Sequence, residues 1–363
     1  MGTRVAASVA LGQMHVPRAA AAPPGLPAVD LFCGAGGLSL GLSASGWQVV
    51  AAVDRDRDAL DTYRGHHPGT AVTDGDIVGM TFRPLRGTVA LVAGGAPCQP
   101  FSSGGLRLAA ADDRDLLPAF FRVVAEVRPV AFLLENVPGL VTGTRRAYLD
   151  RQLVRFRGLL ARDDLGARYR LTMAVLNAAD YGVPQNRRRL FLVGLQSKQP
   201  FEFPDPTHGP GRAAAHVGAG SCVDPVRPVG TPNPSIVTYA RNPDLRPSPY
   251  DGHVYNGGGR PIDLARTSHT ILASAGGNKT HWLDALGTVP AYHAHLRSGG
   301  APRAGTVPGA RRLTVEESAL LQTFSVEVRF AGRRSSRYTQ IGNAVPPRLA
   351  AVIGEAVRAQ LPD

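Results

Sequence analysis

The sequence predicts an α/β protein whose first part is a doubly wound parallel sheet and whose second part is a smaller domain rich in loops. From about residue 26 to residue 195, short continuous apolar segments alternate with segments of helical periodicity, which is typical of parallel strands buried on both faces. Residues 196–312 hold 15 of the 30 prolines and seven of the ten histidines, without a persistent helical pattern. That composition predicts loops rather than regular elements.

The elements of the first part follow from where its apolar runs begin and end. Strands are expected at residues 26–32, 47–53, 89–93, 130–134 and 190–194. Helices are expected at residues 38–45, 57–65 and 116–127. Together these elements predict one α/β domain over residues 26–195. The Ala- and Pro-rich residues 1–25 are expected to be a disordered tail.

The chain after residue 312 becomes regular again. Thr314 stands three residues before Glu317 and precedes an apolar run, which is the signature of a capped helix start. We assign residues 313–338 to a hinge region. Residues 339–363 end as an amphipathic helix, and we expect this C-terminal segment to return to the first domain.

Bulk composition narrows the class of protein. The chain has 363 residues and a formal net charge of +12, and such an excess of positive charge suits a partner made of phosphates. Its three cysteines are odd in number and widely spaced, which indicates reduced thiols in the cytosol rather than a disulfide framework or a zinc site. No apolar run approaches the roughly 20 residues that span a bilayer. We expect no metal and no membrane contact.

A glycine-rich segment, DLFCGAGGLSLGL at residues 30–42, ends the first strand and begins the first helix. Glycines there let the backbone turn tightly and approach a ligand, which the helix N-terminus then faces. Asp54 lies 20 residues after Gly34, at the end of the next strand, where a carboxylate can bind ribose hydroxyls. The segment predicts a nucleoside cofactor; the alternative is a tight turn of any α/β fold.

Three further segments carry reactive or charged side chains at expected strand ends. Cys98, in GGAPCQPFS, stands between two prolines and is either a nucleophile or an inert buried cysteine. Glu135 directly follows an apolar strand. A carboxylate there either has a functional role or simply lies in solvent at the end of the strand. In QNRRR, alternation puts Gln185, Arg187 and Arg189 on one face; the alternative is a solvated basic run.

Taken together, these segments resemble the DNA (cytosine-5)-methyltransferase family, in its bacterial restriction-modification form, from about residue 27 to residue 355. DLFCGAGG, GGAPCQPFS, LENV, QNRRR, RLTVEESALLQTF and QIGNAVPP resemble the family's motifs and follow its order. The resemblance implies a Rossmann-like fold, with residues 26–195 as the catalytic and S-adenosylmethionine-binding domain. It also implies methyl transfer to C5 of a flipped-out cytosine in a specific duplex DNA sequence.

The resemblance implies roles for four candidate catalytic residues. The Cys98 thiolate attacks C6 of the cytosine, which makes C5 nucleophilic enough to take the methyl group. Glu135 holds N3 and the exocyclic amine. Arg189 contacts the base carbonyl, while Arg187 lies near the thiolate and the target phosphate.

The same resemblance implies the cofactor-binding residues. Phe32 stacks on adenine, Asp54 holds ribose and Asp76 reads the adenine amine. The full set is Phe32, Gly34, Ala35, Gly36, Gly37, Asp54, Asp76, Ile77, Pro97, Leu117, Asn343 and Val345.

The implied partner is double-stranded DNA. Residues 196–312 become a target-recognition domain, with Gln185, Thr270, Asn278 and Lys279 as candidate DNA contacts. The glycine-containing segment 102–115 is expected to close over the flipped base. We expect a monomeric, cytoplasmic bacterial protein associated with the nucleoid, with a cognate restriction endonuclease encoded nearby.

Three other functions compete with this interpretation. A tRNA cytosine-5 methyltransferase keeps the chemistry and changes the substrate. A catalytically silent DNA-binding regulator keeps only the fold, but Cys98, Glu135 and Arg189 are all present. A Rossmann oxidoreductase accounts for the first 60 residues and for neither Cys98 nor the basic second domain.

Overall fold

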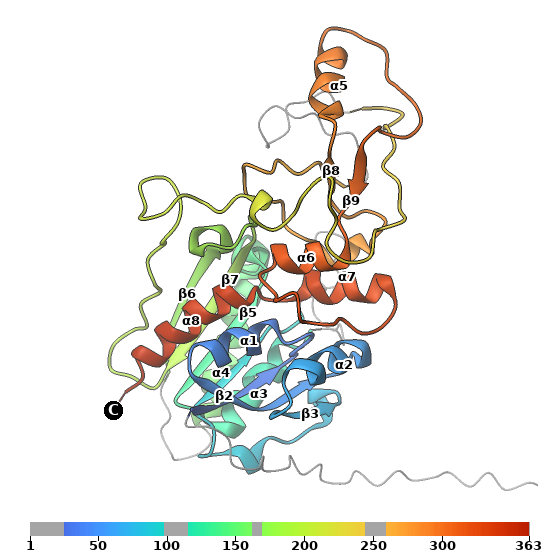
Figure 1. The fold of residues 1–363 in the computed structure, drawn as a ribbon. Helices are drawn as coiled ribbons and strands as arrows, with labels where there is room; N and C mark the ends of the chain where they lie inside the picture. The colour runs from blue at the N-terminus through green and yellow to red at the C-terminus, as the bar shows by residue number, and fades with distance from the viewer. Residues whose placement is uncertain (1–24, 98–114, 162–168, 244–258, 363) are drawn as a thin grey trace, which may run out of the picture.

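The computed structural model describes residues 25–97, 115–161, 169–243 and 259–362. Its main feature is a seven-stranded sheet in the order β3-β2-β1-β4-β5-β7-β6, with helices on both faces (Figure 1). The strands are β1 (Leu26–Leu31), β2 (Trp47–Asp54), β3 (Ala71–Asp74), β4 (Leu91–Gly94), β5 (Ala131–Asn136), β6 (Arg170–Asn177) and β7 (Arg188–Leu195). The helices beside them are α1 (Gly37–Ala44), α2 (Arg57–His66), α3 (Leu117–Val127), α4 (Thr144–Ala161) and α8 (Pro347–Ala359).

The predicted doubly wound sheet is confirmed, but strand β7 runs against the predicted parallel direction. Strands β1 to β5 pair in parallel, whereas β7 is antiparallel to both β5 and β6. Only residues 178–187 connect β6 to β7, and a parallel crossover needs a dozen or more residues. The chain therefore turns back on itself, and the sheet is mostly parallel.

Three elements of this part were not expected from the sequence: β3, β6 and α4. Helix α4 buries Leu149, Leu153, Phe156 and Leu160, whose spacing of three and four residues is that of one helix face. Arginines are interspersed among these residues along the helix. They break up any continuous apolar run, so the helix was not predicted from the sequence.

Two apolar layers enclose the sheet. On one face, Leu38 of α1 and Ile353 of α8 pack with Ala28 and Phe191. On the other face, α3 and α4 pack against alternate residues of the same strands, including Val29. Because successive strand residues point to opposite faces, the continuous apolar runs fill both layers. Helix α8 comes from the far end of the chain, and the indole of Trp47 donates a 2.9 Å hydrogen bond to the carbonyl of Gly354.

The described residues of 196–312 contain little regular structure. They form a two-stranded antiparallel ladder of β8 (Trp282–Asp284) and β9 (Ala310–Arg312) and the helix α5 (Thr288–Arg297), which lies at the top of Figure 1. Helices α6 (Val315–Leu321) and α7 (Arg334–Asn343) lie between this part and the sheet. The predicted cap of α6 is confirmed, since Thr314 and Glu317 form a capping box. No helix in the described ranges is long and apolar enough to cross a membrane.

Candidate active site at the carboxyl ends of the parallel strands

The glycine-rich loop after β1 has an unusual backbone. Phe32 has a φ of 59°, Gly34 of 52° and Gly36 of 84°, so the loop passes three times through the left-handed region that favours glycine. Asp54, at the end of β2, fastens the loop by accepting a 2.8 Å hydrogen bond from the amide of Gly34. A side chain at Gly34 would meet no atom within 4 Å, so this stretch of backbone faces open space.

The C-terminal segment closes one side of this loop. A Cβ added to Gly37 would lie 2.4 Å from the carbonyl oxygen of Val345, closer than real Cβ contacts come. Only glycine lets the two backbones approach this closely. Val345 is buried, while Asn343 at the end of α7 is exposed. Ala35, inside the loop, is buried against the cluster that includes Leu313 and Ile341.

A second wall of the open space follows β3. Asp76 caps a single helical turn, Ile77–Gly79, through a 3.0 Å hydrogen bond from the amide of Val78. Arg122 of α3 fixes this turn by donating hydrogen bonds to the carbonyl of Ile77 and, at 3.0 Å, to the carbonyl of Met80. The carboxylate of Glu126 pairs with Arg122 at 2.6 Å. Asp76 remains exposed and Ile77 is buried.

Cys98 lies outside the described residues, but the chain leading to it is well fixed. The side-chain amide of Asn136 donates a 3.0 Å hydrogen bond to the carbonyl of Ala96. A Cβ on Gly95 would stand 3.2 Å from Oε2 of Glu135. The backbone amide of Leu116 donates a long 3.5 Å hydrogen bond to the carbonyl of Pro97, and the next residue, Leu117, is fully buried. The Glu135 carboxylate thus touches the chain three residues before Cys98.

Glu135 and Arg189 form a largely buried ion pair. Nε of Arg189 lies 3.0 Å from Oε1 of Glu135, and the two side chains are only 16% and 10% exposed. Burial raises the pKa of the Glu135 carboxyl, and the positive charges of Arg189 and Arg187 offset that rise only in part. A carboxyl of this kind retains a proton more readily than a solvated one, so it can serve as a hydrogen-bond donor.

The predicted alternation across QNRRR is confirmed, because Gln185 and Arg187 are buried while Asn186 and Arg188 are exposed. The buried pair makes its contacts inside the protein. Gln185, with no exposed surface, donates to the carbonyl of Leu321 and the amide oxygen of Gln322. Burial lowers the pKa of the Arg187 guanidinium. The structure therefore gives these two side chains partners within the chain, and not the solvent-facing position that a DNA contact needs.

The other candidate DNA contacts lie nearer to solvent. Thr270 is half-buried and donates a 2.6 Å hydrogen bond to the carbonyl of Asn186. Asn278 and Lys279 are exposed. The side-chain oxygen of Asn278 accepts 2.8 Å hydrogen bonds from Arg334 and from Ser235.

Sequence reasoning overlooked two residues that shape the segment around Asn278. Asn233 donates to the carbonyls of Gly277 and Leu313, at 2.9 and 3.1 Å. Arg334, at the start of α7, donates to the oxygens of both Asn233 and Asn278. No local pattern marks either residue, because their partners lie far away along the chain.

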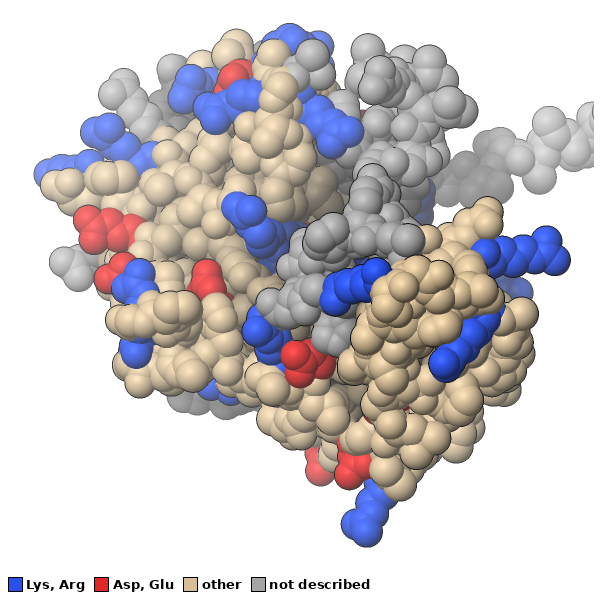
Figure 2. All heavy atoms as spheres, turned by 90° about the horizontal axis from the view of Figure 1, so that it is seen from above, with Lys and Arg blue, Asp and Glu red and all other residues tan. Residues whose placement is uncertain are grey.

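Positive charge predominates on the face seen from above in Figure 2. Blue Lys and Arg side chains outnumber red Asp and Glu side chains on this face. A surface of this kind attracts a polyanion and steers its approach.

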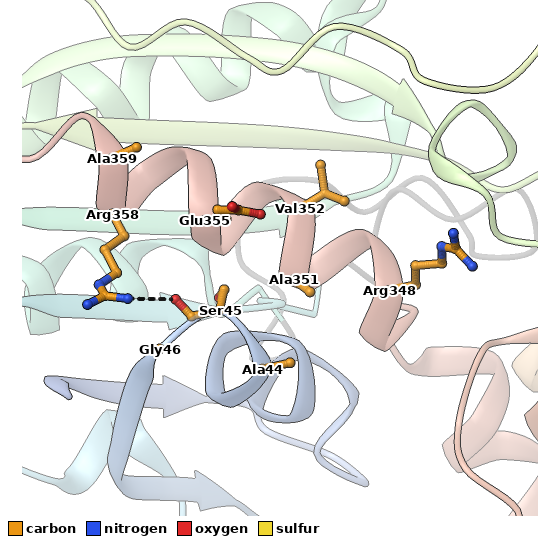
Figure 3. A pocket seen from close by; sticks show the side chains of 9 residues that line it. All are labelled: Ala44, Ser45, Gly46, Arg348, Ala351, Val352, Glu355, Arg358 and Ala359. Atoms are coloured by element: carbon orange, nitrogen blue, oxygen red, sulfur yellow. Dashed lines mark hydrogen bonds between the residues drawn. The ribbon is translucent and has the colours of Figure 1, made fainter. Parts of the chain in front are cut away.

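A groove of about 710 Å³ lies elsewhere, between the end of α1 and the outer side of α8 (Figure 3). Arg358 crosses it to the carbonyl of Ser45 at 3.5 Å. Gly46, which also lines the groove, directly precedes the amino end of β2. The groove therefore begins at the amino ends of the parallel strands, whereas Glu135 and Asp54 lie at their carboxyl ends.

Comparisons with known proteins identify the family of this chain. The model of the family described as C-5 cytosine-specific DNA methylase matches residues 26–222 and 248–359. The chain is 33% identical to the Type II methyltransferase M.PspPI of a Psychrobacter species, over 91% of this chain and 78% of that protein. It is also 33% identical to M1.HphI of Haemophilus parahaemolyticus, over 91% of this chain and 86% of that protein.

Solved structures share the fold at low identity. A variant of DNMT2 from Spodoptera frugiperda superposes with a TM-score of 0.67 at 16% identity, covering 90% of this chain and 97% of that one. The Dnmt2 methyltransferase of S. pombe gives a TM-score of 0.65 at 17% identity, over 92% and 99% of the two chains. These likenesses support the methyltransferase fold, which the sequence predicted.

Proposed function

Because the chain belongs to the C-5 cytosine-specific DNA methylase family, we propose that it methylates C5 of cytosine in a specific duplex DNA sequence, with Cys98 as nucleophile and S-adenosylmethionine as methyl donor. Its relatives are named Type II methyltransferases, and we propose that this chain belongs to a restriction-modification system. The observation that carries the proposal is the buried Glu135–Arg189 pair against Gly95. A proton-retaining carboxyl beside the chain that leads to a cysteine is what addition to a cytosine ring requires.

The residues around the glycine-rich loop fit S-adenosylmethionine. The open space at Gly34 lies beside a carboxylate, Asp54, on a turn that a helix N-terminus faces. Phe32, half-buried and two residues before Gly34, would supply the aromatic ring that stacks on adenine. Asp76 and Ile77 would line the adenine side, with Pro97 and Leu117 beyond, and Asn343 and Val345 would close the opposite wall. When bound, the cofactor supplies the methyl group as an electrophilic sulfonium.

The chain's own groups would act on the base in a defined order. The target cytosine is extruded from the stack, since its ring is unreachable inside a duplex. The Cys98 thiolate forms a bond to C6, while the Glu135 carboxyl donates its proton to N3 and so directs the ring electrons to C5. Once C5 is methylated, its proton leaves to a base. The S–C6 bond then breaks, which restores the thiolate and the aromatic ring, and N3 returns its proton.

Arg189 and the positive surface would serve the same reaction. Arg189 holds the Glu135 carboxylate at 3.0 Å and is placed to donate to the base carbonyl. Residues 196–312 would recognise the target sequence, with Thr270, Asn278 and Lys279 as contacts to phosphate or base edges. We propose that the enzyme acts as a monomer and that a cognate endonuclease cuts the unmethylated site.

Methyl transfer to different polymers tests this function. The chain would be incubated with S-adenosylmethionine labelled in its methyl group and either duplex DNA of mixed sequence or total tRNA, and the products would be digested to nucleosides. We expect 5-methyldeoxycytidine from the DNA and no labelled nucleoside from the RNA. Label in RNA alone, or on the exocyclic nitrogen of cytosine, would contradict the proposal.

A further inference from the structure

We propose that Gln185 and Arg187 are positioning residues that hold residues 267–271 against the chain leading into β7, and so set where target DNA lies relative to Glu135. The inference rests on the proposed function. It concerns how two halves of the molecule are joined beside the active site, because residues 267–271 come from the loop-rich part and residues 184–187 from the sheet part.

The two segments run side by side like paired strands. The amide of Ser268 donates to the carbonyl of Pro184 at 2.9 Å, and the amide of Asn186 donates back to the carbonyl of Ser268 at 2.8 Å. Gln185 and Ser268 form a parallel bridge. The hydroxyl of Thr270 adds a 2.6 Å hydrogen bond to the carbonyl of Asn186. Residues 267–271 thus pair with the segment that leads into β7.

Gln185 uses its whole amide group at this junction. Its oxygen accepts a 2.9 Å hydrogen bond from the amide of Ile271. Its nitrogen donates at 3.2 Å to the carbonyl of Leu321 and at 3.0 Å to Gln322. One fully buried side chain therefore ties together the sheet part, the loop-rich part and α6. Losing it would leave the amide of Ile271 buried without an acceptor, which is costly.

Arg187 completes the junction from the next inward-facing position. Its Nη1 donates at 3.4 Å to the carbonyl of Ile271, and its Nη2 donates at 2.9 Å to the carbonyl of Gly342 in α7. Arg187 is only 1% exposed. Its planar fork can reach two carbonyls at once, a geometry that a lysine ammonium reproduces poorly.

The contact between residues 184–187 and 267–271 connects the candidate DNA contact Thr270 to the Glu135–Arg189 pair over a few residues. Arg187 stands two positions before Arg189, which pairs with Glu135. Ile271, which Arg187 and Gln185 both hold, adjoins the candidate DNA contact Thr270. A small shift of residues 267–271 would therefore move the bound DNA relative to Glu135. Displacements of about 1 Å suffice to slow enzyme reactions severely.

Two neighbouring arginines provide a matched test. Arg187→Lys removes the two-carbonyl contact, whereas Arg188→Lys changes an exposed arginine on the opposite face. The steady-state kcat and KM for DNA, the dissociation constant for S-adenosylmethionine, and the rate ratio between the methylated sequence and sequences changed at one base pair would be measured. For Arg187→Lys we expect KM for DNA to rise about tenfold and the rate ratio to fall, with cofactor affinity within about twofold of wild type. Arg188→Lys should match wild type.

A purely structural role would give a different result. If Arg187→Lys lowers kcat in proportion to the folded fraction, with KM and the rate ratio unchanged, the inference is overturned. Hydrogen exchange on Gln185→Met gives a second test that needs no activity. We expect faster amide exchange in residues 267–271 and unchanged exchange in β1 and β4, and wild-type exchange in 267–271 would overturn the inference. An inactive wild type would instead contradict the proposed function, and the exchange experiment would still test the junction.

Discussion

The sheet part and the loop-rich part of this protein place their side chains by different physical means. In the sheet, apolar burial on two faces and parallel register bring Asp54 and Glu135 to one edge. In the described residues of 196–312, side chains such as Asn233 and His281 fix the loops by forming hydrogen bonds to backbone carbonyls of other segments. The difference shows two ways of fixing a side chain in place. In our proposal, the chemistry depends on the rigid sheet, and target recognition depends on loops that hydrogen bonds hold in shape.

The largest expected effect lies in the sheet part, at Glu135. Glu135→Gln keeps the shape of the side chain and its ability to donate a hydrogen bond, but it cannot transfer a proton to N3. We expect kcat for DNA methylation to fall by about 10²- to 10⁴-fold, with S-adenosylmethionine binding retained. Asp150→Asn, which changes an exposed carboxylate of α4, is the control. Near-normal turnover by Glu135→Gln would remove the carboxyl from the mechanism.

Two buried groups, Asp30 in the sheet part and His281 in the loop-rich part, should make the stability respond to pH in opposite directions. Burial raises the pKa of Asp30 in β1 to about 7, so between pH 4 and 7 the folded state binds more protons than the unfolded state, and the free energy of unfolding falls as pH rises. Burial lowers the pKa of His281 to about 4. Its Nδ1 accepts from the amide of Arg260, an interaction that protonation would abolish. From pH 4 to 6.5 its contribution to the free energy of unfolding therefore rises with pH.

Urea unfolding from pH 4 to 7 separates these contributions. Asp30→Asn should remove a decrease on the order of 4 kcal/mol in the free energy of unfolding across this range. His281→Gln should make the decrease steeper than in wild type. Parallel pH profiles for wild type and both variants would show that neither group titrates as its burial requires.

A smaller effect tests how the sheet part closes its glycine-rich loop. The Cβ that Gly37→Ala introduces would lie 2.4 Å from the carbonyl of Val345, so we expect a loss of about 1–3 kcal/mol in the free energy of unfolding. Gly65→Ala, in α2, is the matched control. Its Cβ would meet no atom within 4 Å, and alanine favours a helix by up to about 1 kcal/mol. Equal thermal melting shifts for the two variants would refute the close contact at Gly37.

The smallest expected effect compares two Arg–carboxylate pairs of identical spacing. Arg122 and Glu126 in α3 are partly buried and hold the turn that carries Asp76 and Ile77, whereas Arg146 and Asp150 in α4 are about half exposed. We expect Arg122→Gln to raise the dissociation constant for S-adenosylmethionine several-fold, because a lost hydrogen bond is worth about 1 kcal/mol. Arg146→Gln should have no measurable effect, since exposed pairs contribute little. Calorimetric titration of both variants distinguishes the outcomes.

How much the sequence could predict also differs between the two parts. Continuous apolar runs located β1, β2, β4 and β5, and the position of Glu135 at a strand end followed from them. Alternation predicted that Gln185 and Arg187 share a face, but not that residues 84 or more positions away would cover it. The contact of Asn233 with Arg334 spans 101 residues. Local patterns record burial and periodicity, and they do not record which distant backbone group a polar side chain meets.

The central claim, covalent catalysis by Cys98 on cytosine in DNA, is tested most directly by trapping the adduct. Duplex oligonucleotides of many sequences, with 5-fluorocytosine in place of cytosine, would be incubated with the protein and S-adenosylmethionine and then analysed under denaturing conditions. Fluorine at C5 cannot leave as a proton does, so the S–C6 bond persists. We predict a denaturation-resistant complex for wild type and none for Cys98→Ala. A complex that forms equally with Cys98→Ala, or none on any duplex despite cofactor binding, would contradict the account.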